Sequence, residues 1–193
     1  MDPGFDPMTL PPGLPVPVDD GGADHLSGLV LPPVVLRSTS GTAVDVAALA
    51  ADRCVLFIFP AMGRPGEEMP RGWDATPGAR GCTPQSCAFR DRHDSFEELG
   101  YVVAGMSAQS EEVQAEAAQR LGLPFELLSD PELILASRLG LPIFEIAGMK
   151  LYKRLTLVAH RGVIAKVFYP VFPPQHNAQE VLRWLRSDTA ATQ

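Results

Sequence analysis

Cysteine is scarce in this sequence of 193 residues, which contains Cys54, Cys82 and Cys87 and no other. An odd and small number of thiols excludes the class of small proteins that are built on a disulfide framework. No segment approaches the roughly 18 consecutive apolar residues of a membrane-spanning helix. The chain also lacks the basic and then apolar opening of a secretory signal. We therefore expect a cytosolic protein that has no membrane partner.

An excess of basic residues is also absent. The formal net charge is −7 and the isoelectric point is near 5.0. A general nucleic-acid binder needs a basic face, so this charge balance argues against a nucleic-acid partner. The hydrophobic fraction of 46% is ordinary for a globular protein. A chain of this length is long enough to bury one core without covalent cross-links.

Proline is abundant only at the beginning of the chain, where the first 20 positions hold six of the 19 prolines. A segment of this composition is typical of a mobile, partly polyproline arm. We expect such an arm over residues 1–25, and an added leader is one interpretation of its first residues, MDPGFDP. One domain is expected over residues 26–188, followed by a flexible tail at 189–193.

Apolar runs and amphipathic segments alternate along the rest of the chain. A short strand pair with a helical turn is expected over residues 28–50, and a Gly- and Pro-rich loop over 61–81. The predicted strands are 53–60, 101–107, 124–130 and a hairpin over 154–171, and the predicted helices are 83–100, 110–123, 131–141 and 177–187. This order predicts an α/β domain with a central mixed sheet that is flanked by helices on both faces.

Cys82 and Cys87 lie where the long loop meets the first of these helices. The first amides of a helix have no partner within the helix and carry partial positive charge, which favours an anion such as a thiolate. Pro84 suits the first helical turn because its missing N–H is not needed there. The local sequence thus places Cys82 where a reactive thiolate is stabilised.

The five-residue spacing of the two cysteines constrains a disulfide between them. In a helix their Cα atoms would lie about 8.7 Å apart, whereas a disulfide needs less than about 7 Å. A bridge therefore requires the first helical turn to unwind. The spacing indicates a two-state element, helical when reduced and locally unfolded when oxidised.

The residues alone leave other roles for the thiols open. Cys54 lies within an apolar run and is interpreted as a small core residue. A zinc site needs about four ligands, and only His93 lies near Cys82 and Cys87 in the sequence. The remaining interpretations are a nucleophile with its resolving thiol, metal ligation and plain packing.

The segment GCTPQSCAFRD resembles the active-site helix of the peroxiredoxins, in particular the Q-type group, also called bacterioferritin comigratory proteins. The resemblance extends over roughly residues 28–186. It implies that Cys82 is the peroxidatic cysteine and that Cys87 is the resolving one. Gln85 lies where the family often has Glu or Gln. The segment KRLTLVAHRGVIAKVF is similar to the family's last hairpin and places Arg154 on the active-site arginine.

The resemblance implies a thioredoxin-like fold and a thiol-dependent peroxidase that acts on hydrogen peroxide and organic hydroperoxides. A thioredoxin-like dithiol would reduce an intramolecular disulfide, and neither a metal nor an organic cofactor is required. No C-terminal resolving cysteine is present, so we expect a monomer or a weak dimer.

The loop before Cys82 departs from the family pattern. Ala75 and Ala79 stand where the family has Pro and Thr or Ser, so Thr76 or Thr83 is expected to supply the hydroxyl, and Arg80 to add positive charge. Two alternative functions stay open, and the altered loop adds weight to the second of them. One is a protein thiol-disulfide oxidoreductase that consumes little peroxide, and the other is a non-catalytic interaction domain on the same scaffold.

Overall fold

A computed structural model describes residues 6–191 of the chain. A seven-stranded mixed sheet forms its centre, in the order β2-β1-β5-β4-β3-β8-β9. The central strands β3, β4 and β5 are parallel, and β1, β8 and β9 extend the sheet with antiparallel pairs. The strands of this sheet are β1 (Val35–Ser38), β2 (Ala43–Asp45), β3 (Arg53–Ile58), β4 (Val102–Ser107), β5 (Leu127–Ser129), β8 (Leu155–His160) and β9 (Val163–Phe168).

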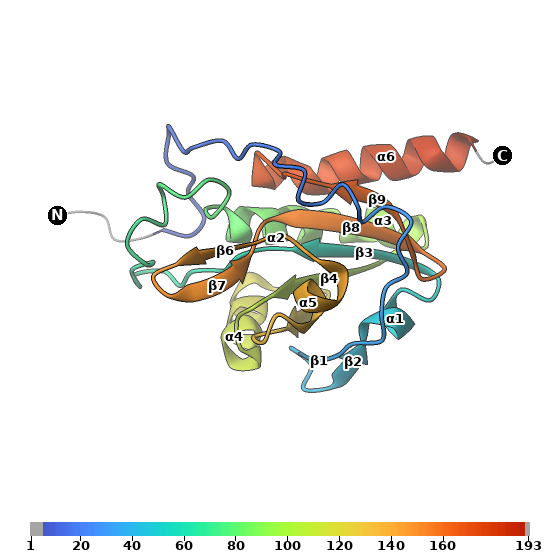
Figure 1. Ribbon diagram of the computed structural model, residues 1–193, viewed down its shortest axis with the longest axis horizontal. Coiled ribbons are helices and arrows are strands. Elements are labelled where there is room, and N and C mark those ends of the chain that lie inside the picture. The colour runs from blue at the N-terminus through green and yellow to red at the C-terminus, as the bar shows by residue number, and fades with distance from the viewer. Residues whose placement is uncertain (1–5, 192–193) are drawn as a thin grey trace.

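Helices cover both faces of this sheet, as the alternating pattern predicts (Figure 1). They are α1 (Val46–Leu49), α2 (Cys82–Arg90), α3 (His93–Glu98), α4 (Glu111–Leu121), α5 (Ile134–Leu139), η1 (Pro174–His176) and α6 (Asn177–Ala191). The predicted mixed α/β sheet is confirmed. No helix in the described part of the chain is both long and apolar enough to cross a membrane.

Successive residues of β3 point into two different cores because side chains alternate along a strand. Leu56 and Ile58 pack with α1 and α5, whereas Val55 and Phe57 pack with α2, α3, α4 and α6. The ring of Phe57 stacks on that of Phe89 with centroids 4.4 Å apart, which fixes α2 over the centre of the sheet. The helix that begins with Cys82 is thereby held by a buried aromatic contact.

A second sheet of two strands, β6 (Ile143–Ile146) and β7 (Met149–Tyr152), projects beside the main one. The sequence pattern did not predict this sheet. Its turn is Ala147–Gly148, where both residues have positive φ, and alanine gives none of the usual signal for that backbone conformation. Trp73 and Ala79 of the loop at 61–81 pack against Ile146 and Leu151 in a third small core. The long loop is therefore anchored by burial.

Two predicted helices have different bounds. The helix expected over 83–100 is two helices, α2 and α3, with a turn at residues 91–92. The helix expected to open at Pro131 begins at Ile134. Asp130 accepts hydrogen bonds from the amides of Ile134 and Leu135, so its carboxylate satisfies the first turn and sets that start.

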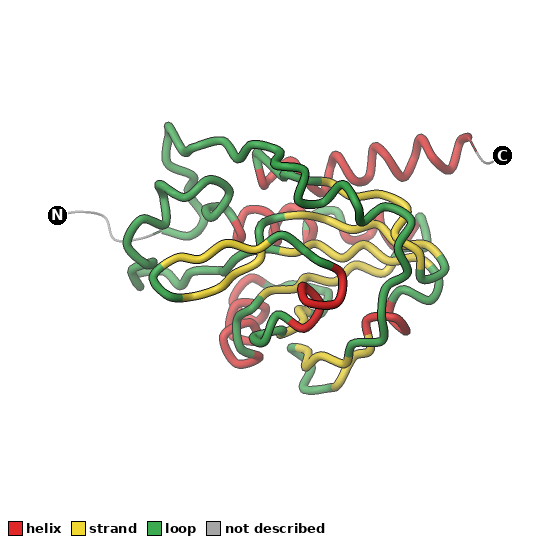
Figure 2. Tube along the Cα trace, in the orientation of Figure 1, coloured by secondary structure: helices red, strands yellow, loops and turns green. Residues whose placement is uncertain are grey.

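The described residues of the N-terminal segment form no helix and lie along the body (Figure 2). Arg80 donates hydrogen bonds to the carbonyl oxygens of Asp6 and Thr9, and Lys153 pairs with Asp20. This segment and the loop before α2 therefore lie on the same side of the molecule. Mobility of the arm stays a prediction.

Candidate active site

Cys82 is the first residue of α2, and its side chain is only 3% exposed. Gly81 precedes it with φ of 101°, a left-handed conformation that glycine adopts without strain. A Cβ atom at Gly81 would come within 2.3 Å of Pro174 Cγ, so only glycine fits this close approach. Pro84 falls in the first turn, as the sequence predicts. Cys82 is thus buried at the start of α2, next to the close contact between Gly81 and Pro174.

Arg154 meets the sulfur of this cysteine. Its Nη2 lies 3.2 Å from Cys82 Sγ and also donates to the carbonyl oxygens of Gly78, Ala79 and Arg80 at 3.0–3.3 Å. The guanidinium therefore holds the end of the loop and places a fixed positive charge against the sulfur. Such a charge stabilises a thiolate and can orient an anionic leaving group.

Gln85 connects this arginine to the opposite wall of the site. Its Oε1 accepts a short hydrogen bond from Arg154 Nη1, and its Nε2 donates to Asn177 Oδ1 at 2.9 Å. Asn177 Oδ1 also accepts from the Thr156 hydroxyl at 2.7 Å. All four side chains are buried. This network fixes the plane of the Arg154 guanidinium, because Gln85 is itself held by Asn177 and Asn177 is held by Thr156.

Asn177 and Thr156 belong to this network although the sequence did not predict them as site residues. Asn177 is the first residue of the helix predicted over 177–187, and its Oδ1 accepts hydrogen bonds from Gln85 of α2 and Thr156 of β8. Thr156 is two residues after Arg154, which directly precedes β8, so in extended backbone the two side chains point the same way. The spacing of two residues between Arg154 and Thr156 is the sequence signal that could have placed Thr156 in the network.

Cys87 lies on the same helix, five residues after Cys82, and is 6% exposed. Burial raises the pKa of its thiol, and the charges of Arg90 and Arg120 partly oppose that effect. All three cysteines are reduced in this structure. Cys54 lies on β3, where complete burial raises its pKa to about 12. Cys54 therefore behaves as a core residue, as predicted.

The loop residues expected near the sulfur fall in different places. Thr83 is buried in the first turn of α2. The Thr76 hydroxyl donates to the carbonyl oxygen of Gly72 at 2.9 Å, and Thr76 lines a cavity together with Arg154. The Arg80 side chain reaches Asp6, Thr9 and Asp74, so its charge is directed at the N-terminal segment. This geometry does not favour the expectation that Arg80 adds positive charge near the sulfur of Cys82.

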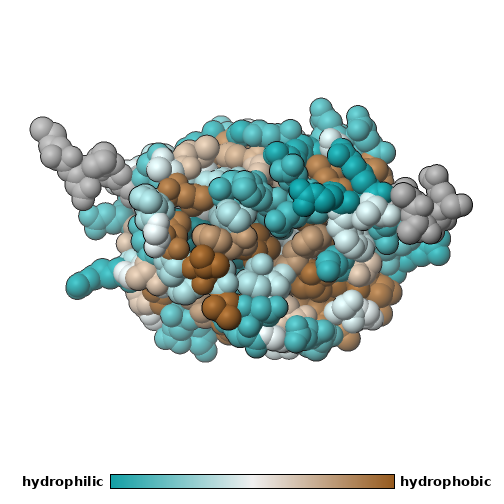
Figure 3. Space-filling view, turned by 90° about the horizontal axis from the view of Figure 1, so that it is seen from above, coloured by the Kyte–Doolittle hydropathy of each residue, from teal (hydrophilic) through white to brown (hydrophobic). Residues whose placement is uncertain are grey.

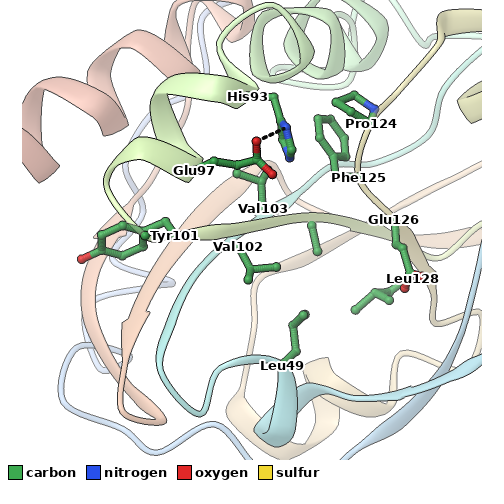
Figure 4. Close-up of a pocket in the computed structure, with 12 residues that line it drawn as sticks. Leu49, His93, Glu97, Tyr101, Val102, Val103, Pro124, Phe125, Glu126 and Leu128 are labelled. Atoms are coloured by element: carbon green, nitrogen blue, oxygen red, sulfur yellow. Dashed lines mark ion pairs between the residues drawn. The ribbon is translucent and has the colours of Figure 1, made fainter.

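His93, the only histidine near the cysteines in sequence, belongs to a different region. Figure 4 shows it pointing toward Glu97 across one turn of α3, beside a cavity of about 490 Å³. The two side chains form an ion pair at 3.7 Å when His93 is protonated. His93, Asp94 and Glu97 bring potential ligand atoms within 4.8 Å of one another, and neither Cys82 nor Cys87 belongs to this group. The metal-ligand interpretation of the two thiols thus gains no support.

Comparison with known proteins matches this arrangement to one family. The Redoxin family profile covers residues 26–182. The chain is 29% identical to chloroplastic peroxiredoxin Q of Sedum lineare over 176 residues, which cover 91% of this chain and 86% of that protein. It is also 29% identical to peroxiredoxin Q of Oryza sativa subsp. japonica, covering 83% of this chain and 66% of the rice protein.

A solved structure agrees with these relatives. Peroxidoxin BcpB from Mycobacterium tuberculosis superimposes with a TM-score of 0.68 at 27% identity, over 84% of this chain and 97% of that one. Its likeness confirms the predicted thioredoxin-like fold of the peroxiredoxin type. From its sheet, its helix-start cysteine and these relatives, the chain belongs to the Redoxin family and is a peroxiredoxin of the Q type.

Proposed function

We propose that the chain is a thiol peroxidase in which Cys82 is the peroxidatic residue. The contact of 3.2 Å between Arg154 Nη2 and Cys82 Sγ at the start of α2 carries this proposal. Both the guanidinium and the unpaired amides of the first helical turn favour a negative charge on sulfur. The peroxiredoxin relatives of the chain support the same reaction, the reduction of a peroxide by a thiol.

The first step is a two-electron oxidation of Cys82. The thiolate attacks the terminal oxygen of a hydroperoxide, an S–O bond forms and the O–O bond breaks. The leaving oxygen departs as an alkoxide or hydroxide and takes up a proton from water. Cys82 becomes a sulfenic acid. Arg154 stabilises the negative charge that passes from sulfur to the leaving oxygen, because its position is already fixed by Gln85 and the loop carbonyls.

The second step joins Cys82 to Cys87. The Cys87 thiolate attacks the sulfenic sulfur, an S–S bond forms and hydroxide leaves to become water. Both cysteines are helical in this structure, and ideal helix geometry separates the Cα atoms of residues at this spacing by about 8.7 Å. The start of α2 must unwind before the bond can form. Sulfinic acid forms instead where a second peroxide arrives before unwinding is complete.

A dithiol of the thioredoxin class returns the enzyme to its reduced form. Its thiolate attacks the disulfide, and its second thiol releases it, so that two electrons pass to Cys82 and Cys87. The reaction needs no resident metal or organic cofactor. A cytosolic location, and a monomer or weak dimer in solution, stay predictions.

The test is to add one equivalent of hydrogen peroxide to the reduced protein and to map peptides without reducing them. The proposal predicts rapid loss of the Cys82 thiol and a disulfide between Cys82 and Cys87. Slow loss of that thiol together with rapid exchange with protein disulfides would favour the oxidoreductase alternative. An inert thiol would favour the non-catalytic interaction domain.

A further inference from the structure

A cavity of about 360 Å³ lies beside Arg154, which is one of its lining residues. Its walls are mainly apolar. They come from the N-terminal segment, from the loop before α2, from β6 and from the segment that follows β9, and they include Val16, Val18, Pro77, Phe144, Tyr169 and Val171. Arg154 is thus shared, because it contacts Cys82 Sγ and also lines this cavity.

Asp20 holds the N-terminal wall through two hydrogen bonds, from Lys153 and Tyr169, which we call the Asp20 clamp. The carboxylate of Asp20 accepts hydrogen bonds from Lys153 Nζ at 2.5 Å and from the Tyr169 hydroxyl at 2.6 Å. Both donors also line the cavity. Their hydrogen bonds lower the pKa of Asp20, so its carboxylate stays negatively charged at neutral pH. Residues 16–20 are therefore a built wall of the cavity.

A second contact joins this wall to the catalytic loop. Pro17 packs over Gly78, where an added Cβ would lie 3.6 Å from Pro17 Cβ. The carbonyl oxygen of Gly78 in turn accepts a hydrogen bond from Arg154. The N-terminal segment thus contacts the loop that positions the guanidinium.

Val16 and Val18 have no role in the core that would explain their apolar side chains. They are 61% and 81% exposed, yet both line the cavity. Seen from the side of α6 and the N-terminal segment, hydrophobic residues gather in patches on the surface (Figure 3). The two valines also precede residue 26, where the match to the Redoxin family begins.

We propose that Val16 and Val18, held by the Asp20 clamp, are specificity-determining residues that bind the apolar substituent of an organic hydroperoxide beside Arg154. This inference rests on the proposed peroxidase function. An apolar group in the cavity leaves water, and its peroxide end is directed to the guanidinium that contacts Cys82. Hydrogen peroxide has no such substituent and gains nothing from the cavity.

The test compares kcat/KM for cumene hydroperoxide with kcat/KM for hydrogen peroxide in the full chain. Removing apolar contacts of this size from a pocket costs on the order of tenfold in discrimination. We therefore expect the ratio of the two constants to fall about tenfold in Val16→Gln/Val18→Gln. Asp20→Ala, which releases the clamp, lowers the ratio in the same direction. The matched controls are Val35→Gln, an equally exposed valine on β1, and Asp19→Ala, and both leave the ratio unchanged.

A binding measurement separates this inference from the proposed function. Calorimetry measures the affinity of Cys82→Ser for 2-phenyl-2-propanol, the alcohol product of cumene hydroperoxide. The same measurement is made on Cys82→Ser that also carries Val16→Gln/Val18→Gln. Weaker binding by this second protein supports the inference even where no peroxide is reduced. Equal binding by both proteins, or none, overturns it. An unchanged ratio in an active enzyme also overturns it and leaves the peroxidase function standing.

Discussion

Arg154 Nη2 lies 3.2 Å from Cys82 Sγ, although 72 positions separate the two residues in the sequence. The contact joins the first residue of α2 to the residue that directly precedes β8, and both residues are buried. One guanidinium thereby serves three functions. It charges the environment of the sulfur, binds the carbonyl oxygens of the preceding loop and forms one wall of the adjoining cavity.

Arg154→Lys tests whether the shape of this group matters beyond its charge. Lysine keeps a positive charge but loses the planar fork that reaches the sulfur, Gln85 and the loop at once. Loss of one such donor typically costs about 100-fold or more in rate. We expect a decrease of about that size in the second-order rate constant of Cys82 with hydrogen peroxide, measured by stopped flow. Arg37→Lys, on the exposed face of β1, is the control and stays at the wild-type rate.

Gln85→Ala tests whether the network behind the arginine positions it. The change removes the acceptor that Gln85 offers to Arg154 Nη1 and one of the two donors to Asn177 Oδ1. We expect the rate of Cys82 oxidation to fall about tenfold, since one buried hydrogen bond to a charged group is worth about 1.5 kcal/mol or more. Gln85→Glu keeps the acceptor for Arg154 and restores most of the rate.

The controls for Gln85 separate positioning from stability. Gln119→Ala changes an exposed glutamine on α4 and leaves the rate unchanged. Melting temperatures are recorded for all three variants. A loss of rate in Gln85→Ala that Gln85→Glu fails to restore would show that the bond to Arg154 is not what matters.

Cys87→Ser tests the resolving step. Because no second thiol can capture the sulfenic acid, we expect one normal turnover and no recycling by thioredoxin. In the wild-type protein, oxidation breaks the hydrogen bond from the Gln85 amide to the Gly81 carbonyl oxygen as α2 unwinds. Hydrogen exchange at that amide therefore speeds up in the oxidised wild-type protein and stays slow in oxidised Cys87→Ser.

The third cysteine serves as the control for this experiment. Cys54→Ala is recycled by thioredoxin like the wild type, because Cys54 is buried on β3 away from both thiols of the reaction. Sustained turnover by Cys87→Ser with thioredoxin would remove Cys87 from the mechanism.

Cys54 also predicts a dependence of stability on pH. Its folded pKa, raised by burial to about 12, exceeds the value near 8.5 of an unfolded cysteine. The folded state therefore keeps a proton that the unfolded state loses. This contribution is fully present below pH 8.5 and is lost as the pH rises toward 12.

Urea unfolding at pH 7.5, 9 and 10 measures this contribution. Above pH 9 we expect the free energy of unfolding to fall by up to about 1.4 kcal/mol per pH unit more steeply in the wild type than in Cys54→Ala. Equal slopes in the two proteins would contradict the burial of this thiol.

The parts of the fold that local sequence determines were the ones predicted from it. The apolar run at 53–60 and the hairpin at 154–171 correspond to β3 and to β8 with β9. The position of Cys82 at a helix start follows from Gly81 and Pro84, which act within a few residues. The meeting of Arg154 with Cys82 came from the family resemblance, because nothing in the spacing of the two residues indicates it.

The parts that depend on distant contacts could not be predicted. Gln85 and Asn177 are 92 positions apart, and their bond exists only because α2 packs beside the start of α6. The placement of residues 6–20 likewise depends on Arg80, Lys153 and Tyr169, whose side chains reach it from three separate segments. A proline-rich composition carries no information about such anchors.

The rate at which one equivalent of hydrogen peroxide oxidises Cys82 in the folded protein, compared with the same chain unfolded in urea, tests the central assignment most directly. Unfolding removes both the helix start and the Arg154 contact but leaves the thiol itself. A folded protein that reacts more than about 100-fold faster is the predicted result. Equal rates in the two states would show that the fold does not activate this cysteine, and the assignment of Cys82 as the peroxidatic residue would be wrong.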